Sequence, residues 1–179
     1  MRFSKLPRTA AAAVALVMFA APVFAQQKGP ALPGGASSLQ ETYQDWSLTC
    51  QSNASNVVCA ISQQQTQQNG QRILAVELRH NADDSLAGTL ILPFGLLLEA
   101  GATLQVDDGQ PLEPLRFSTC LPAGCVVPLS FDEQTASALR AGSVLKVKLR
   151  STDQKDLTLS VSLKGLAPAL DRLKTLAGA

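Results

Sequence analysis

Apolar and polar residues alternate in DWSLTCQ (residues 45–51) and again in VVCAISQ (57–63), with the turn-forming residues SNASN between them. Alternation with a period of two, interrupted by a turn, is typical of a β-hairpin. A turn centred on the middle of SNASN would place Cys50 directly opposite Cys59, close enough across an antiparallel pair for a disulfide. The pattern therefore predicts a hairpin whose two strands can be cross-linked.

Seven later segments show strand-like patterns and are bounded by turn residues. They are RILAVELR (72–79), LAGTLILP (86–93), ATLQVD (102–107), PLRFSTC (114–120), CVVPLSF (125–131), SVLKVKLR (143–150) and LTLSVSL (157–163). DDGQ at 107–110 is a hairpin-turn signal, because Asp and Gly tolerate the positive φ that such turns need. Many short strands without helical crossovers favour an antiparallel β-sandwich over a parallel sheet.

Two segments have helical patterns. In FDEQTASALRAG, Asp132 is suited to the N-cap and Gly142 follows the last periodic residue, which predicts a short helix between strands. In GLAPALDRLKTL, the residues Leu166, Leu170 and Leu173 share one face. We expect this C-terminal helix to pack on the sandwich, because it is short and its few charges are mixed, unlike a membrane-surface helix. The predicted fold is mainly β: a single antiparallel β-sandwich-like domain with one short inserted helix and a C-terminal helix.

The N-terminus has the pattern of a secretory signal. MRFSKLPR is basic, TAAAAVALVMFA is apolar, and PVFA ends with small residues where a signal peptidase would cut, after Ala25. The apolar run is too short for an uncleaved membrane helix. We therefore expect a signal peptide over residues 1–25, a flexible Pro-, Gly- and Ser-rich leader over 26–42, and one folded domain over 43–179.

Charge and hydropathy narrow the location and partners. The chain has a formal net charge of +1, and removing residues 1–25, which carry three basic residues and no acid, changes it to −2. This balance argues against nucleic-acid binding. No later segment is apolar enough to span a bilayer. We expect an exported protein whose mature chain is soluble or peripherally associated with the envelope.

Four cysteines remain after the expected signal cleavage, an even number in a chain expected to reach an oxidising compartment. Disulfides are the default, and three pairings are possible. Local pairing of Cys50 with Cys59 and of Cys120 with Cys125 is favoured by the first hairpin and by the tight LPAG turn, although the other pairings stay open. A redox dithiol is disfavoured because four residues separate Cys120 from Cys125, and zinc because eight separate Cys50 from Cys59.

Catalytic, metal and cofactor signatures are weak, so we predict no catalytic, metal or cofactor site. His80 is the one histidine and follows a predicted strand, where a surface or loop role is commonest. No Gly-x-Ser-x-Gly motif occurs. The acid pairs Asp83/Asp84 and Asp107/Asp108 could suggest carboxylate chemistry or calcium binding, but both lie beside turn residues, where Asp bonds to its own backbone.

Two segments are candidates for an interaction surface. LPFGLLLEAG places Phe94, Leu96 and Leu97 in an apolar run too long for one strand face, so either both faces are covered or some side chains are exposed to a partner. QQQTQQNGQ, with Gln64 and Gln67, is either a polar contact surface or a solvated hairpin loop that turns at Asn-Gly, and we favour the loop.

Several motifs together resemble the invasion-associated locus B family of exported bacterial proteins. They are LILPFGLLLEAGATLQVDDG, FSTCLPAGCVVPL, LRAGSVLKVKL and LTLSVSLKGLAPAL, within residues 43–174. Leu166 departs from the pattern, since an aromatic residue is expected there. The resemblance implies a periplasmic, outer-membrane-associated or secreted protein with a β-sandwich-like fold, and it supplies no catalytic residue.

We therefore expect a non-enzymatic protein that acts on a protein or cell-surface partner, with host-cell invasion or adhesion as one role. A periplasmic chaperone or small-ligand-binding protein is the alternative, and would show an apolar cavity. A carboxylate-based hydrolase is a weaker alternative, and would show acids with raised pKa values converging in a pocket.

Overall fold

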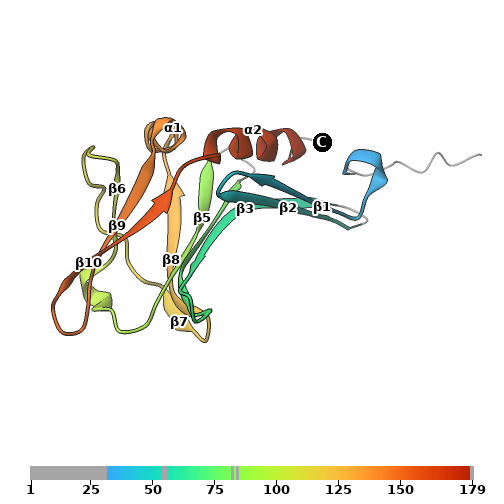
Figure 1. Ribbon diagram of the computed structural model, residues 1–179. Helices are drawn as coiled ribbons and strands as arrows, with labels where there is room; N and C mark the ends of the chain where they lie inside the picture. The colour runs from blue at the N-terminus through green and yellow to red at the C-terminus, as the bar shows by residue number, and fades with distance from the viewer. Residues whose placement is uncertain (1–31, 54–55, 82, 84, 178–179) are drawn as a thin grey trace, which may run out of the picture.

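The computed structural model describes residues 32–53, 56–81, 83 and 85–177. The expected signal peptide, residues 1–25, lies outside this range, as do residues 26–31 of the expected leader. Within the described range the chain forms two antiparallel sheets and two α-helices around one hydrophobic core (Figure 1). The prediction of a mainly β, sandwich-like domain with an inserted and a C-terminal helix is confirmed.

The sheets differ in size. The strands of the large sheet are β1 (Ser38–Tyr43), β2 (Trp46–Ser52), β3 (Val57–Thr66), β4 (Arg72–His80), β5 (Leu86–Leu92), β7 (Thr119–Leu121) and β8 (Gly124–Phe131). Their order is β1-β2-β3-β4-β5-β8-β7. The strands of the small sheet are β6 (Thr103–Val106), β9 (Val144–Arg150) and β10 (Asp156–Ser162), in the order β10-β9-β6. Each of the nine predicted segments contains a strand, although PLRFSTC contributes only its last two residues, to β7.

The large sheet also contains β1, a strand that was not predicted from the sequence. It pairs along its whole length with β2, and Leu32 before it is 2% exposed in the core. The expectation of a flexible leader over residues 26–42 is therefore wrong for residues 38–42. The pattern was hidden because Glu41, a charged residue, occupies an inward-facing position between Leu39 and Tyr43.

The two helices form as their sequences predict. Helix α1 (Glu133–Ala141) begins after Asp132, whose Oδ1 accepts a hydrogen bond of 2.7 Å from the Thr135 backbone N–H, and it ends before Gly142. Helix α2 (Leu166–Ala177) covers the inner face of β1, β2 and β3 (Figure 1). Its apolar side is buried in the core, through Leu166, Ala169, Leu170, Leu173 and Leu176.

Both disulfides join residues that lie directly opposite each other in a hairpin. Cys50 pairs with Cys59 across β2 and β3, and Cys120 pairs with Cys125 across β7 and β8. The favoured local pairing is confirmed. Each bridge closes a short loop, so it restrains one hairpin and does not connect distant parts of the fold.

The two sheets are joined by hydrogen bonds from side chains of the large sheet to the outer edge of β10. Trp46 Nε1 and Gln63 Nε2 both donate to the Ser162 carbonyl oxygen, each at 3.0 Å, and Gln65 Nε2 donates to the Ser160 carbonyl oxygen at 2.7 Å. Alternate residues of an edge strand point their backbone groups outward, so these carbonyls would otherwise lack strand partners. The Gln-rich segment is thus partly structural: only residues 67–71 form the predicted loop.

We predict that the effects of Trp46→Phe and Gln63→Leu on the free energy of unfolding are coupled. Each single substitution leaves the Ser162 carbonyl with one donor, whereas the double variant leaves it with none, and an unsatisfied buried carbonyl costs about 1 to 3 kcal/mol. The double variant should therefore lose about 1 kcal/mol or more of unfolding free energy beyond the sum of the single losses, measured by urea denaturation.

The matched control combines Trp46→Phe with Gln105→Leu, because Gln105 Nε2 donates to the Gly109 carbonyl and shares no partner with Trp46. The losses of unfolding free energy in that pair should add to within about 0.5 kcal/mol. Additivity in both pairs would show that the shared carbonyl does not hold the two sheets together.

Candidate functional site

The loop after β5 separates the predicted apolar residues. Phe94 is 62% exposed, whereas Leu96 is 6% exposed and Leu97 is half-buried. The loop is held against the end of β9, because Leu97 N–H donates to the Arg150 carbonyl at 2.8 Å and Leu96 forms a bridge with Ser151. Burial and exposure, the two interpretations of this run, therefore each apply to part of it.

Three more exposed apolar side chains occur on neighbouring turns. Leu98 (43% exposed) follows Phe94 in the same loop, and Leu157 (41%) lies near the start of β10, opposite Leu149 at the end of β9. Leu121 (52%) is paired with Gly124, whose backbone packs against the end of β5. These turns lie at the end of the molecule away from α2 (Figure 1).

The β3–β4 turn, which carries Gln67, also belongs to this end. Arg72, just after the turn, donates a hydrogen bond of 3.4 Å to the Ala123 carbonyl in the β7–β8 turn. We call this region the loop end and define it by Phe94, Leu98, Leu121, Leu157 and Gln67. It gathers four of the five exposed large apolar side chains in the described part of the chain.

Gln64 lies elsewhere, on the outer face of the large sheet. It is paired with Ala75 of β4 and lines a shallow groove of about 340 Å³ together with Arg72 and Ile91. The five candidate interaction residues from the two segments are thus divided between the loop end, this outer face and the packed side of the β5 loop.

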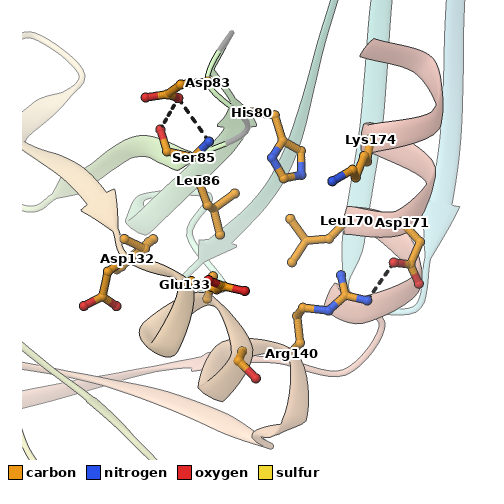
Figure 2. Close-up of a pocket in the computed structure, with 13 residues that line it drawn as sticks. His80, Asp83, Ser85, Leu86, Asp132, Glu133, Arg140, Leu170, Asp171 and Lys174 are labelled. Carbon is orange, nitrogen blue, oxygen red and sulfur yellow. Dashed lines mark hydrogen bonds and ion pairs between the residues drawn. The ribbon is translucent and has the colours of Figure 1, made fainter. Parts of the chain in front are cut away.

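A larger cleft opens at the opposite end, between α1, α2 and the β4–β5 turn (Figure 2). Its volume is about 710 Å³, and its floor is formed by Leu86, Phe131 and Leu170, all buried. Ionisable side chains from all three elements surround this floor: His80, Asp83, Asp132, Glu133, Arg140, Asp171 and Lys174.

Hydrogen bonds keep two of the cleft acids ionised at neutral pH. The Ser85 hydroxyl and backbone N–H both donate to Asp83 and lower its pKa, and hydrogen bonds from Thr135 lower the pKa of Asp132. Arg140 Nη2 lies 2.6 Å from Asp171 Oδ1, which links α1 to α2 by an ion pair. The cleft therefore combines fixed charges of both signs with an apolar floor.

The second predicted acid pair has structural partners. Asp107 accepts hydrogen bonds from the Ser143 and Val144 backbone N–H groups, the latter at 2.9 Å. Asp108 lies 2.8 Å from Lys146 Nζ, which lowers the pKa of Asp108. A lowered pKa is the opposite of what a general acid needs. Asp84 of the first pair lies outside the described residues. Among those described, no three His, Cys, Asp or Glu side chains are grouped to hold a metal ion.

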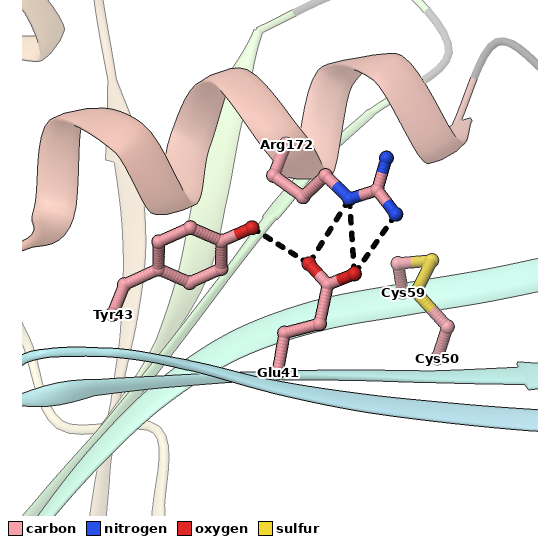
Figure 3. The surroundings of a disulfide bond; sticks show 5 residues. All are labelled: Glu41, Tyr43, Cys50, Cys59 and Arg172. Carbon is pink, nitrogen blue, oxygen red and sulfur yellow. Dashed lines mark hydrogen bonds and ion pairs between the residues drawn. A yellow bond between two sulfur atoms is a disulfide. The ribbon is translucent and has the colours of Figure 1, made fainter.

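An ion pair fixes α2, one wall of the cleft, to β1 (Figure 3). Arg172 donates to both carboxylate oxygens of Glu41, with Nη2 at 2.8 Å from Oε1 and Nε at 3.0 Å from Oε2. The Tyr43 hydroxyl donates to Glu41 Oε2 at 2.6 Å. The Arg172 hydrogen bond, and after it that of Tyr43, lowers the pKa of Glu41, so this carboxylate is charged where the sheet meets the helix.

Sequence reasoning did not find the cleft or this ion pair. The cleft residues come from three separate segments with no local motif, and Glu41 and Arg172 are 131 positions apart. The amphipathic pattern of GLAPALDRLKTL was the one available signal, because it predicted a docked helix that needs a partner surface.

The fold is a two-sheet antiparallel sandwich with a helix docked on one sheet and two local disulfides. The sequence model of the Invasion associated locus B (IalB) protein family matches residues 46–174, and the chain belongs to this family. It is 46% identical over 147 residues to an Invasion protein B homolog of Brucella abortus (strain 2308), covering 81% of this chain and 84% of that protein.

Two Bartonella proteins are also similar. Invasion protein B of Bartonella bacilliformis is 35% identical over 173 residues, covering 90% of this chain and 93% of that protein. The crystal structure of invasion associated protein B from Bartonella henselae superposes with a TM-score of 0.73 at 37% identity, covering 77% of this chain and 96% of that chain. The suggested family resemblance is thus confirmed.

We predict that Arg172→Gln destabilises the protein in a pH-dependent way. At neutral pH the loss of unfolding free energy should exceed that of an ordinary surface ion pair, because a bidentate, charge-assisted pair is removed. Folding lowers the pKa of Glu41 below its usual value of 4.5, so the pair stabilises the fold fully above that value. Its contribution is lost as the pH falls through the folded pKa.

Urea denaturation between pH 3 and 8 measures this effect. Arg140→Gln is the control, because its ion pair with Asp171 is exposed and should contribute less than about 1 kcal/mol. An Arg172→Gln loss that stays constant down to pH 3 would contradict the ionic origin of the effect.

Proposed function

We propose that this protein is a non-enzymatic exported protein that binds a protein or cell-surface partner through the loop end. The observation that carries the proposal is the grouping of Phe94, Leu98, Leu121 and Leu157, each more than 40% exposed, at one end of the molecule. Gathered apolar side chains are typical of interaction sites, whereas single exposed ones are ordinary. Phe94 is the natural anchor, since aromatic residues dominate binding energies at interfaces.

The scaffold suits an extracytoplasmic location. Disulfides join all four cysteines, as expected in an oxidising compartment, and the N-terminal sequence has the pattern of a cleaved secretory signal. Neither helix in the described part of the chain is long and apolar enough to cross a membrane. The disulfides and the signal-like N-terminal sequence support a periplasmic, outer-membrane-associated or secreted protein.

The role follows from the family. The relatives from Brucella and Bartonella are named as invasion proteins, and we extend that role to this chain as binding to a host surface or to an envelope component. Binding is favoured over catalysis because the acids considered for catalysis already have structural partners. Asp107 accepts hydrogen bonds from backbone N–H groups, and Asp108 forms an ion pair with Lys146. Asp83 likewise bonds to its own turn.

A second candidate function, small-ligand binding, is favoured by the cleft between α1 and α2. Its volume of about 710 Å³ lies in the range of small-molecule sites. This function does not compete with the first, because α1 and α2, which line the cleft, lie at the end of the molecule opposite the turns of the loop end (Figure 1).

We predict that Phe94→Ser and Leu121→Ser abolish partner capture without destabilising the fold. Chemical cross-linking in the intact native cell, followed by fractionation and mass spectrometry, should join the wild-type protein to an outer-surface or host component. Loss of an aromatic anchor should weaken that complex by about 2 kcal/mol, or roughly thirtyfold.

Val58→Ser is the matched control, because Val58 is 59% exposed but faces outward from β3, away from the loop end. It should keep the cross-link. A periplasmic monomer joined to nothing, or a cross-link that survives Phe94→Ser, would overturn the proposal.

A further inference from the structure

The cleft between α1, α2 and the β4–β5 turn has a chemical polarity that points to a class of ligand (Figure 2). Its floor is aliphatic and aromatic. Leu86 and Phe131 are paired across β5 and β8, and Leu170 of α2 packs beside them in the core. These three side chains are 2 to 5% exposed, so a ligand gains little by covering them and its charged ends must supply most of the affinity.

Acidic side chains lie along one side of the floor. Asp132 and Glu133 begin α1, and Asp83 lies in the β4–β5 turn (Figure 2). The hydrogen bonds from Thr135 and Ser85 to these aspartates use part of their acceptor capacity, and a carboxylate has about four acceptor positions. This side can therefore accept hydrogen bonds from a ligand cation.

Basic side chains lie along the other side. Arg140 comes from the last turn of α1, and Lys174 comes from α2 (Figure 2). Arg140 bonds to Asp171 through one nitrogen, and a guanidinium has five N–H donors, so the ion pair leaves donors that a ligand anion can reach. The two helices thus present cations opposite the acids of the α1 N-terminus.

A ligand that satisfies both sides needs a cation and an anion separated by an apolar body. We propose that the cleft binds a short zwitterionic peptide with aliphatic side chains. Its terminal ammonium would face Glu133, its terminal carboxylate would face Arg140 and Lys174, and its side chains would lie over the floor between them. The hydroxyls of Ser85 and Ser137, which also line the cleft, suit peptide N–H and carbonyl groups.

Other ligand classes fit the cleft less well. A neutral lipid would desolvate charges of both signs without pairing them. A phosphate or other anion could pair with the basic side chains, but it carries no positive group to pair with the acidic ones. Arg140 is already paired with Asp171, so the ammonium is the more strongly bound end. This inference names the ligand class for the second candidate function, on which it rests, and does not depend on the loop end.

The test uses the exported chain with both disulfides formed and the tripeptide Ala-Leu-Ala as the probe, in titration calorimetry. The unmodified tripeptide should bind saturably. N-acetylation should weaken binding about tenfold and C-terminal amidation about threefold, because each removes one charged hydrogen-bonding end and the acidic side is the stronger.

Two substitutions assign the ends of the ligand. Glu133→Gln should reduce the effect of N-acetylation and leave that of amidation, and Lys174→Gln should do the reverse. Both side chains are exposed, so the fold should tolerate the changes. Glu113→Gln and Lys155→Gln are the matched controls, because they make the same changes at exposed positions outside the cleft, and they should bind like the wild type.

Absence of saturable binding, or equal affinity for the free, acetylated and amidated peptides, would overturn the inference. So would an equal effect of the cleft and control substitutions. Phe94→Ser should bind the tripeptide like the wild type, so failure at the cleft and failure of the loop-end proposal are distinguishable.

Discussion

The arrangement of the two sheets depends on how the edge of β10 is satisfied. A buried backbone carbonyl without a donor is costly, and the Ser162 carbonyl receives one donor from β2 and one from β3, through Trp46 and Gln63. Only three residues separate Ser162 from α2, and a Cβ on Gly165 would lie 2.0 Å from the Tyr43 carbonyl oxygen. The same contact that joins the sheets therefore also positions the first residues of α2 beside β1.

The position of α2 explains why the sandwich is incomplete. The helix covers the inner face of β1, β2 and β3, a part of the large sheet that the three-stranded sheet does not cover. The inward-facing Glu41 is compatible with this arrangement because Arg172 of the helix neutralises it. Where α2 meets α1, above the ends of β5 and β8, the helices leave the charged cleft between them.

The two proposed surfaces differ in the interactions that they offer. The loop end presents exposed apolar side chains on turns that are held by neighbouring strands, which suits a macromolecular partner. The cleft encloses fixed charges around a small apolar floor, which suits a small polar ligand. The disulfides restrain the β2–β3 and β7–β8 hairpins, and the second of these carries Leu121 of the loop end.

The sequence by itself determined the features that depend on near neighbours. These are nine of the ten described strands, the position of Cys50 opposite Cys59, and the start of α1 at Asp132, because alternation, turn chemistry and capping act over a few residues. Only the tertiary structure decided that Gln63 is buried and that Glu41 can face inward from β1. Their partners lie 99 and 131 positions away, and a polar residue becomes compatible with the core only where the fold brings its partner to it.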